Sequence, residues 1–432
     1  MNTRFPVSLF LASIVAATLL PAASPADRNT DESKVGAYAL PEVLLTKDGR
    51  RVANTTLWRE IRRGELIEDF AVSTYGRTPS LSVKLRAETI AVRRDAVDGL
   101  ATRILVRLRF FEDPAAPEVT LMLYLPNAAR GPVPCLLGLN YYGVASVESD
   151  PALPLTDRWM RPAADMGIVK NRATEATRGK HASRWPLALA LRRGYAVATY
   201  YYGDIEPDHP EGWRDGLRGY LMRKEGRTSR GPDEWGAIGV WAWGLSRALD
   251  HLQTLPGIDA GRVAVFGHSR QGKTALWAGA QDERFGAVIS NNSGEGGAAL
   301  GRRDFGERIA DSVRVNIFWY CENYRSFAGR AGARPVDQHM LLALSAPRPL
   351  YVASATLDLG ADPRGEFVSA VHAAPAYWLF GYEGLGTAEL PPPDRPIGHR
   401  IGYHLRTGAH DITAYDWEQF IGFLDRTLPA HR

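Results

Sequence analysis

Residues 263–274 of this 432-residue chain read VAVFGHSRQGKT, a short apolar run followed by a turn that contains two glycines. The run at 263–266 has the length and composition of a strand buried on both faces. The segment from about residue 271 to 279 has the composition of a helix. A strand, a tight turn and a helix in this order predict an α/β protein with a functional group at the turn.

Two kinds of site share this pattern. In a phosphate-binding loop, the stretch from Gly267 to Thr274 fits G-x-x-x-x-G-K-[ST], with backbone N–H groups around the phosphates, Lys273 on the terminal ones and Thr274 on magnesium. In a serine nucleophile elbow, Gly267 permits the turn, Ser269 lies at its tip, and the N–H of Arg270 stabilises an oxyanion. The usual elbow pattern G-x-S-x-G is imperfect here, because the second glycine lies at 272.

The residues downstream favour the elbow, since a serine elbow of this kind is followed by an acid and then a histidine. An apolar run beginning at residue 352 ends in Asp358, and His410 lies in a glycine-containing loop before the last predicted helix. Several predicted strands precede the turn, whereas a phosphate loop usually follows the first strand of its domain. We therefore predict a triad of Ser269, Asp358 and His410. The alternative acids are Asp362 and Glu295.

Strands and helices alternate along the rest of the chain. Predicted strands lie at 104–110, 119–125, 134–140, 195–202, 263–266, 287–290 and 350–355, and predicted helices at 187–191, 235–252, 271–279 and 417–428. This alternation predicts a mostly parallel sheet covered by helices on both faces. Residues 27–60 have the composition of an irregular segment. Residues 143–185 are polar and proline-containing, which predicts a functional insertion within a single catalytic domain at 27–432.

Composition limits the classes of ligand. Hydrophobic residues make up 45% and charged residues 23% of the chain, which is typical of a globular protein, and the formal net charge of +4 comes without a basic block that would bind nucleic acid. The histidines lack the spacing of metal ligands, so we predict no metal and no cofactor.

The chain has two cysteines, Cys135 and Cys321, which are too few for a disulfide scaffold or a multi-cysteine zinc site. Buried free thiols are favoured for both, and a single disulfide is the alternative.

The N-terminus has the pattern of a secretory signal peptide over residues 1–26. A short basic start is followed by an apolar run at 5–20 and by small residues that suit cleavage near 23–26. A membrane anchor is the alternative, but it needs about 20 apolar residues and this run is shorter. No other segment is long and apolar enough to cross a membrane. The sequence therefore predicts export to the periplasm or the medium, with no membrane attachment after cleavage.

At the turn, the sequence GHSRQGK at 267–273 resembles the signature of carbohydrate esterase family 15, the glucuronoyl esterases, and of its bacterial branch in particular. The resemblance extends from about residue 100 to the C-terminus. Further matching stretches are RWP at 184–186, RGYA at 193–196, YYGD at 201–204, NSG at 292–294, PVDQH at 335–339, APRP at 346–349, ADPRGE at 361–366 and HLR at 404–406.

This resemblance implies an α/β-hydrolase fold, a serine triad, and cleavage of esters between glucuronic acid, often 4-O-methylated, of glucuronoxylan and alcohol groups of lignin. We expect the protein to be a monomer. Ser269 falls on the nucleophile, His410 on the base, and Arg270 on the arginine that assists the oxyanion. Lys273 and Glu307 fall on residues that bind hydroxyls of the uronic acid. Lys273 is also one helical turn beyond Ser269, on the same face of the predicted helix.

The chain departs from the family pattern at two positions. Many members carry the triad acid as a glutamate where this chain has Asn292, whereas bacterial relatives often have an aspartate where this chain has Asp358. Bacterial members usually have a tryptophan against the sugar where this chain has Gly360. Two alternative functions therefore stay open: another exported serine carbohydrate esterase of the same fold, such as an acetyl-xylan esterase, and a non-catalytic polysaccharide-binding relative.

Overall fold

A ten-stranded sheet forms the centre of the molecule in the computed structural model, which describes residues 28–428. The strand order is β1-β2-β3-β5-β4-β6-β7-β8-β10-β9. The strands are β1 (Arg86–Ala96), β2 (Ala101–Arg109), β3 (Glu118–Pro126), β4 (Val133–Asn140), β5 (Ala196–Tyr201), β6 (Ile258–His268), β7 (Ala287–Asn291), β8 (Leu350–Ala355), β9 (Ile397–Gly398) and β10 (Ile401–Arg406).

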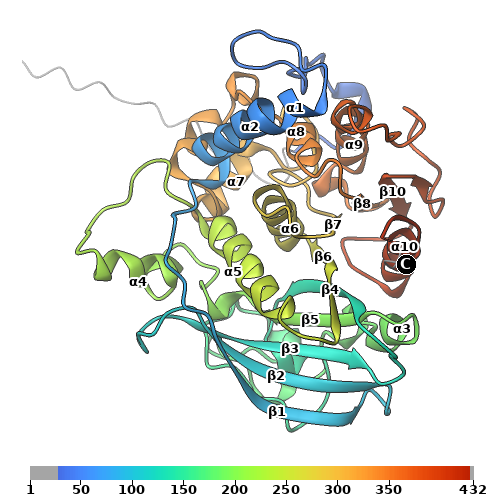
Figure 1. Cartoon of the computed structure of the whole chain (residues 1–432). Helices are drawn as coiled ribbons and strands as arrows, with labels where there is room; N and C mark the ends of the chain where they lie inside the picture. The colour runs from blue at the N-terminus through green and yellow to red at the C-terminus, as the bar shows by residue number, and fades with distance from the viewer. Residues whose placement is uncertain (1–27, 429–432) are drawn as a thin grey trace, which may run out of the picture.

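The middle of the sheet is parallel. Strands β5, β4, β6, β7, β8 and β10 run parallel to one another. At one side of the sheet β1, β2 and β3 pair in antiparallel fashion with one another and with β5, and at the other side β9 pairs in antiparallel fashion with β10. The carboxyl ends of β6, β7, β8 and β10 therefore lie side by side along the same end of the sheet (Figure 1). We call this the carboxyl edge of the sheet. In open α/β sheets this edge is where ligands bind.

Helices cover both faces of the sheet, as the alternation of strands and helices predicted. Those named here are α1 (Thr55–Leu57), α2 (Arg63–Phe70), α3 (Leu187–Arg192), α4 (Leu217–Lys224), α5 (Ala237–Leu252), α6 (Arg270–Gln281), α7 (Ile309–Asn316), α8 (Gln338–Ala343), α9 (Pro363–Trp378) and α10 (Ala414–Thr427). Helices α5, α6, α8 and α9 share one hydrophobic core with alternate strand residues such as Val265 and Val352. Helices α3 and α10 share the other core with their neighbours Ala264 and Tyr351, because successive side chains of a strand point to opposite faces.

Several segments differ from the sequence-based expectation. The segment at 27–60 is irregular only to Asn54, whose side chain caps α1, and a π-helical turn at Trp58–Arg62 then joins α1 to α2. Strands β1 and β9 and helices α2, α4, α7, α8 and α9 had no predicted counterpart. Residues 403–406 belong to β10 and not to the loop that precedes the last helix.

The insertion at 143–185 contains only short 3₁₀ turns, which bind one another and the sheet edge. The guanidinium of Arg178 donates to the carbonyls of Asp150 and Leu153 at 3.1 and 2.6 Å. At the far end of the insertion, Arg184 forms an ion pair of 2.7 Å with Asp411, the residue after the predicted catalytic histidine. The insertion thus returns to the edge of the sheet where the predicted site residues lie.

The two cysteines are both buried, and neither forms a disulfide. Cys135 lies in β4, and Cys321 follows the 3₁₀ turn at Ile317–Trp319. The predicted signal peptide at 1–26 lies outside the described residues. Within residues 28–428, no helix has both the length and the apolar character that a membrane crossing requires.

Candidate active site

The predicted elbow is present where β6 meets α6. Ser269 is the single residue between them, and its backbone has φ 56° and ψ −130°, a left-handed conformation that is unfavourable for a residue with a side chain. Gly267 makes the turn possible, since a Cβ atom there would lie 1.9 Å from the carbonyl oxygen of Gln271. Backbone strain of this kind is typical of functional sites, and here it presents the serine at the start of a helix.

His410 and Asp358 meet at the same edge of the sheet. Asp358 follows β8, His410 follows β10, and Nδ1–H of the histidine donates to Oδ2 of the aspartate at 2.6 Å. The side chain of Asp358 is 10% exposed and that of His410 is 43% exposed. The ring of His410 lies 4.5 Å from the ring of His268, the residue before Ser269. Because Nδ1 is bound to the acid, Nε2 is the ring nitrogen left to accept a proton from a serine.

Asn292 supports the acid. It has a left-handed φ of 47°, and its Nδ2–H donates to the same Oδ2 of Asp358 at 2.8 Å. Burial tends to raise the pKa of Asp358, but the hydrogen bonds from His410 and Asn292 outweigh it and hold the pKa below its ordinary value of 3.8. The carboxylate therefore stays ionised beside the histidine.

The two alternative acids bind other groups. Asp362 caps the first turn of α9 through the N–H of Gly365 at 2.9 Å and pairs with Arg303 at 2.9 Å. Glu295 accepts hydrogen bonds from the hydroxyls of Ser312 and Tyr324. Of the three acids that the sequence suggested, only Asp358 contacts His410.

Arg270 begins α6, so its backbone N–H belongs to the helix N-terminus, where donors lack partners within the helix. Its side chain forms an ion pair of 2.9 Å with Asp208 and lies 4.7 Å above the ring of Tyr141. The hydroxyl of Tyr141 in turn donates to the carbonyl of His268. Sequence reasoning assigned no role to Tyr141 or Asp208, because both are more than fifty residues from the elbow and carry no motif.

Lys273 is buried, with 4% of its surface exposed, and its ammonium donates to the carbonyls of Ser293, at 2.6 Å, and Glu295. The hydroxyl of Thr274 donates to the carbonyl of Arg270 at 3.0 Å. A phosphate-binding loop would need both side chains for its ligands, so these contacts argue against that alternative. An ammonium has three N–H groups, which leaves one for a substrate hydroxyl.

Glu366 is a buried carboxyl beneath the loop that follows β7. It accepts from the N–H groups of Ser293 and Gly294 at 2.8 and 2.9 Å and from the hydroxyl of Ser354 at 2.6 Å. Burial raises its pKa to about 7. These bonds hold the loop that carries Asn292. Its place in the family-like stretch 361–366 was the only sequence signal for it.

Glu307 and Gly360 contact each other in space, next to Asp358. The N–H of Glu307 donates to the carbonyl of Gly360 at 2.8 Å, and its carboxylate lies 3.6 Å from Arg28. A Cβ atom on Gly360 would have Oδ1 of Asp358, 3.9 Å away, as its nearest neighbour. The turn at 359–361 therefore has open space where a larger side chain would stand.

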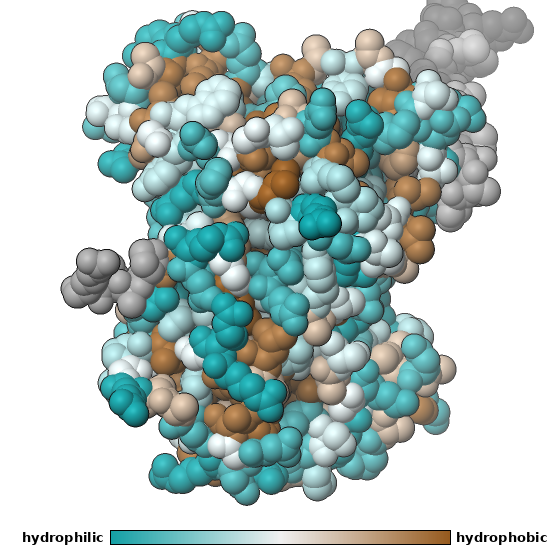
Figure 2. Space-filling model, turned by 90° about the vertical axis from the view of Figure 1, so that its right-hand side faces the viewer, coloured by the Kyte–Doolittle hydropathy of each residue, from teal (hydrophilic) through white to brown (hydrophobic). Residues whose placement is uncertain are grey.

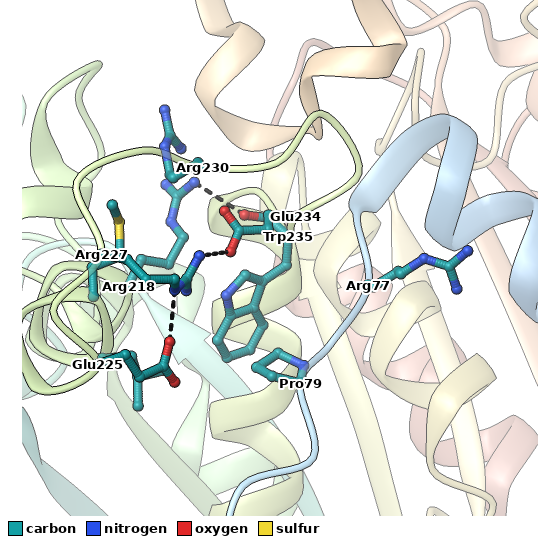
Figure 3. Close-up of a pocket in the computed structure, with 10 residues that line it drawn as sticks. Arg77, Pro79, Arg218, Glu225, Arg227, Arg230, Glu234 and Trp235 are labelled. Atoms are coloured by element: carbon teal, nitrogen blue, oxygen red, sulfur yellow. Dashed lines mark hydrogen bonds and ion pairs between the residues drawn. The ribbon is translucent and has the colours of Figure 1, made fainter.

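A separate pocket lies beside α4 and contains none of the predicted site residues (Figure 3). Arg227 in it is paired with Glu225 at 2.7 Å and with Glu234, and the side chain of Arg77 points away toward its own partners. The cavity volume is about 60 Å³, which is room for a few water molecules. The described residues contain no cluster of three or more side chains that could hold a metal ion.

Known proteins share this fold over nearly the whole chain. The structure of a glucuronoyl esterase from Solibacter usitatus is 45% identical and has a TM-score of 0.87, with 92% of this chain and all of that one covered. A promiscuous esterase of carbohydrate esterase family 15 from a marine bacterial metagenome is 42% identical, also with a TM-score of 0.87, over 93% of this chain and all of that one. The curated carbohydrate esterase MZ0003, from an unknown prokaryotic organism, is 43% identical over 94% of this chain and 93% of its own length. The chain belongs to carbohydrate esterase family 15, the glucuronoyl esterases.

A family model for fungal glucuronyl esterases also matches residues 229–381 of this esterase. That range contains the elbow, Asn292 and Asp358, but not His410. The comparisons confirm the predicted α/β-hydrolase fold and the assignment of this glucuronoyl esterase to the carboxylic ester hydrolases.

Proposed function

We propose that this glucuronoyl esterase cleaves esters that join glucuronic acid, with or without a 4-O-methyl group, of glucuronoxylan to alcohols of lignin. The observation that carries this proposal is the pairing of His410 with Asp358 at 2.6 Å beside the strained elbow of Ser269. The arrangement has the parts that acyl transfer through a serine requires.

In the proposed reaction, Oγ of Ser269 attacks the ester carbonyl while Nε2 of His410 takes its proton. Asp358 keeps the imidazole in the right tautomer and stabilises it when it is charged. The oxyanion receives the N–H and the guanidinium of Arg270. The protonated histidine then gives its proton to the leaving alcohol, and a water molecule activated by His410 hydrolyses the acyl-enzyme and releases the uronic acid.

The uronic acid is proposed to lie on the side of Lys273 and Glu307. Lys273 has one N–H that its two carbonyl partners do not use, and it lies on the first turn of α6 together with Arg270. Glu307 is partly exposed and bound through its backbone to the turn at 359–361. Both are suited to bind ring hydroxyls, which an acetyl ester lacks.

The protein is proposed to be exported through its signal peptide at 1–26 and to act as one catalytic domain at 27–432, without a nucleic acid, membrane or cofactor. The protein is also proposed to be a monomer, and the one face shown in Figure 2 fits this, because hydrophilic side chains separate its hydrophobic patches. Subunit interfaces that are permanent usually leave larger apolar areas on the isolated chain.

A second candidate function is hydrolysis of other carbohydrate esters, such as acetyl-xylan. It is favoured by Gly360, since the turn lacks the aromatic side chain that would cover a sugar, and the metagenomic relative is itself described as promiscuous.

The test compares kcat/KM of the purified protein on a benzyl glucuronate ester and on a 4-nitrophenyl acetate ester. The proposal expects the glucuronate ester to be preferred by at least about tenfold, with Ser269→Ala inactive on both substrates. A preference for acetate supports the second candidate. Absence of turnover together with retained binding of xylan supports a non-catalytic protein.

A further inference from the structure

Asp208 binds five donor atoms and is completely buried. Its Oδ2 lies 2.9 Å from Nε of Arg270 and 2.8 Å from Nε of Arg161. The same oxygen accepts a hydrogen bond from the hydroxyl of Tyr202 at 2.9 Å. Its Oδ1 accepts from Nε1 of Trp319 at 2.7 Å and from Nη2 of Arg161 at 3.1 Å. A buried carboxylate with this many donors holds its partners in one arrangement.

The guanidinium of Arg270, the hydroxyl of Tyr202 and the carboxylate of Asp208 form a closed ring of contacts. Nη2 of Arg270 donates to the hydroxyl of Tyr202 at 3.4 Å, that hydroxyl donates to Asp208, and Asp208 pairs with Nε of Arg270. The Nε–H bond does not point straight at the oxygen, so this last contact is an ion pair. Two nitrogens of the guanidinium are thus occupied, and Nη1 has no partner among the described residues.

Asp208 and its two arginine partners together carry a net positive charge. One carboxylate faces two guanidiniums, and Arg161 comes from the insertion at 143–185. Burial tends to raise the pKa of Asp208, but Arg270 and Arg161 outweigh it and hold the pKa below its ordinary value. Asp208 is therefore ionised, and it cancels only one of the two positive charges. The remaining charge is available to an oxyanion.

We propose that Asp208 is a positioning residue, which fixes the guanidinium of Arg270 with Nη1 left for the oxyanion, and that Arg161 of the insertion completes this arrangement. This inference rests on the proposed oxyanion role of Arg270. Asp208 itself touches no reacting atom in this scheme. Its effect on the reaction therefore passes through Arg270.

A double-mutant cycle tests the inference, with Asp208→Asn, Arg270→Ala and the double variant assayed on the benzyl glucuronate ester. Removal of one oxyanion donor typically lowers kcat by about 10²–10³-fold. Asp208→Asn is expected to lower kcat by about tenfold or more with KM changed by less than about threefold, and equally on the acetate ester, because both substrates form an oxyanion. The double variant is expected to match Arg270→Ala within about threefold.

Two outcomes would overturn the inference: kcat of Asp208→Asn within about threefold of the wild type, or a loss in the double variant equal to the product of the single losses. Full activity of Arg270→Ala would also overturn it, while Ser269→Ala tests the esterase assignment separately. If Asp208→Asn does not fold, Tyr202→Phe is the second test, because it removes the hydroxyl that donates to Asp208 and keeps the buried aromatic side chain. That variant should lower kcat in the wild-type background and not in Arg270→Ala.

Asp204→Asn is the matched control. Asp204 is also a buried carboxyl of the same segment, and its partners are Thr156 at 3.2 Å and the N–H of Thr120 at 3.5 Å. It does not contact Arg270. Its substitution should leave kcat unchanged, and a loss equal to that of Asp208→Asn would show that any buried carboxyl of this segment has the same effect.

Discussion

At the scale of single residues, one oxygen atom of Asp358 connects two strand ends. It receives a hydrogen bond from His410, which follows β10, and another from Asn292, which follows β7. Asn292 occupies the position where the family resemblance places a glutamate in many members. In this chain the amide at that position orients the acid and does not replace it.

Asp358→Asn should lower kcat by up to about 10⁴-fold with little change in KM. An uncharged side chain leaves the imidazolium unsupported and allows the wrong tautomer of His410, which is a loss of transition-state stabilisation and not of substrate binding. The measurement is steady-state kinetics on the benzyl glucuronate ester. A kcat within about threefold of the wild type would mean that another group serves as the acid.

Asn292→Glu should restore part of the activity of Asp358→Asn. The amide nitrogen of Asn292 is 2.8 Å from the carboxylate that holds His410, so a glutamate there brings a charged oxygen to nearly the same place. The double variant is expected to exceed Asp358→Asn by at least about tenfold in kcat. Asn292→Gln in the same background has the longer side chain without the charge and should give no recovery.

At the scale of elements, the short turn after β8 has open space beside the acid, where the family resemblance places an aromatic side chain against the sugar. Gly360→Trp is expected to lower KM for the glucuronate ester, because the turn has open space and an aromatic ring gives a sugar face an apolar contact. Gly360→Ala is the control for the change of backbone freedom, and the acetate ester is the control for substrate. An unchanged KM would indicate that the turn lies away from the sugar.

Helix α6 joins the elbow to the loop after β7 through Lys273. Lys273→Met keeps the length of the side chain but leaves the carbonyls of Ser293 and Glu295 without their donor, at a cost of about 1–3 kcal/mol for each buried group. The Tm should fall, and kcat/KM should fall far more for the glucuronate than for the acetate ester. An equal loss on both esters would mean that Lys273 supports only the loop.

The elements that sequence reasoning found are those whose patterns are local. A short apolar run in the sequence is enough to predict each of the strands β4, β6, β7 and β8. The hydrophobic stripe along residues 235–252 predicts helix α5 in the same way. Strand β10 does not, because His404 and Arg406 make it look like a polar loop. Both side chains are buried and bind Asp416 of α10, at 2.9 and 3.0 Å. A polar strand becomes stable here through a carboxylate of the following helix, and a local residue pattern does not show that these side chains meet.

At the scale of the whole molecule, the same limit applies to the site. The elbow, the acid and the histidine follow from chain order, since this type of triad has a fixed sequence of residue types. The groups that hold Arg270 do not follow from chain order, because Asp208 precedes the elbow by about sixty residues and Arg161 belongs to the insertion at 143–185. These contacts depend on the folded arrangement alone, so the structure was needed to find them.

Stability should depend on pH through Asp204. Burial raises its pKa from the ordinary value of 3.8 to about 7, so the folded state binds a proton that the unfolded state has released between these values. This contribution makes the folded state less stable as pH rises from about 4 to 7, by at most about 4 kcal/mol at about 1.4 kcal/mol for each pKa unit.

Asp204→Asn removes this dependence. The difference in Tm between the variant and the wild type should be near zero at pH 4 and should reach its largest positive value above pH 7. The measurement is thermal unfolding of both proteins in buffers from pH 4 to 8. A constant difference across this range would show that Asp204 does not titrate within it.

The meeting of Asn292 and Asp358 suggests how a triad can change without ever being lost. The ends of the neighbouring strands β7 and β8 bring both side chains to one point, so a carboxyl could be present at both positions before either one is replaced. During such a stage two carboxyls would lie close enough to share a proton, and one of them would titrate at a higher pH. A chain with acids at both positions, as in the Asn292→Glu variant, should therefore be active, and its acidic limit of activity should differ from that of the wild type.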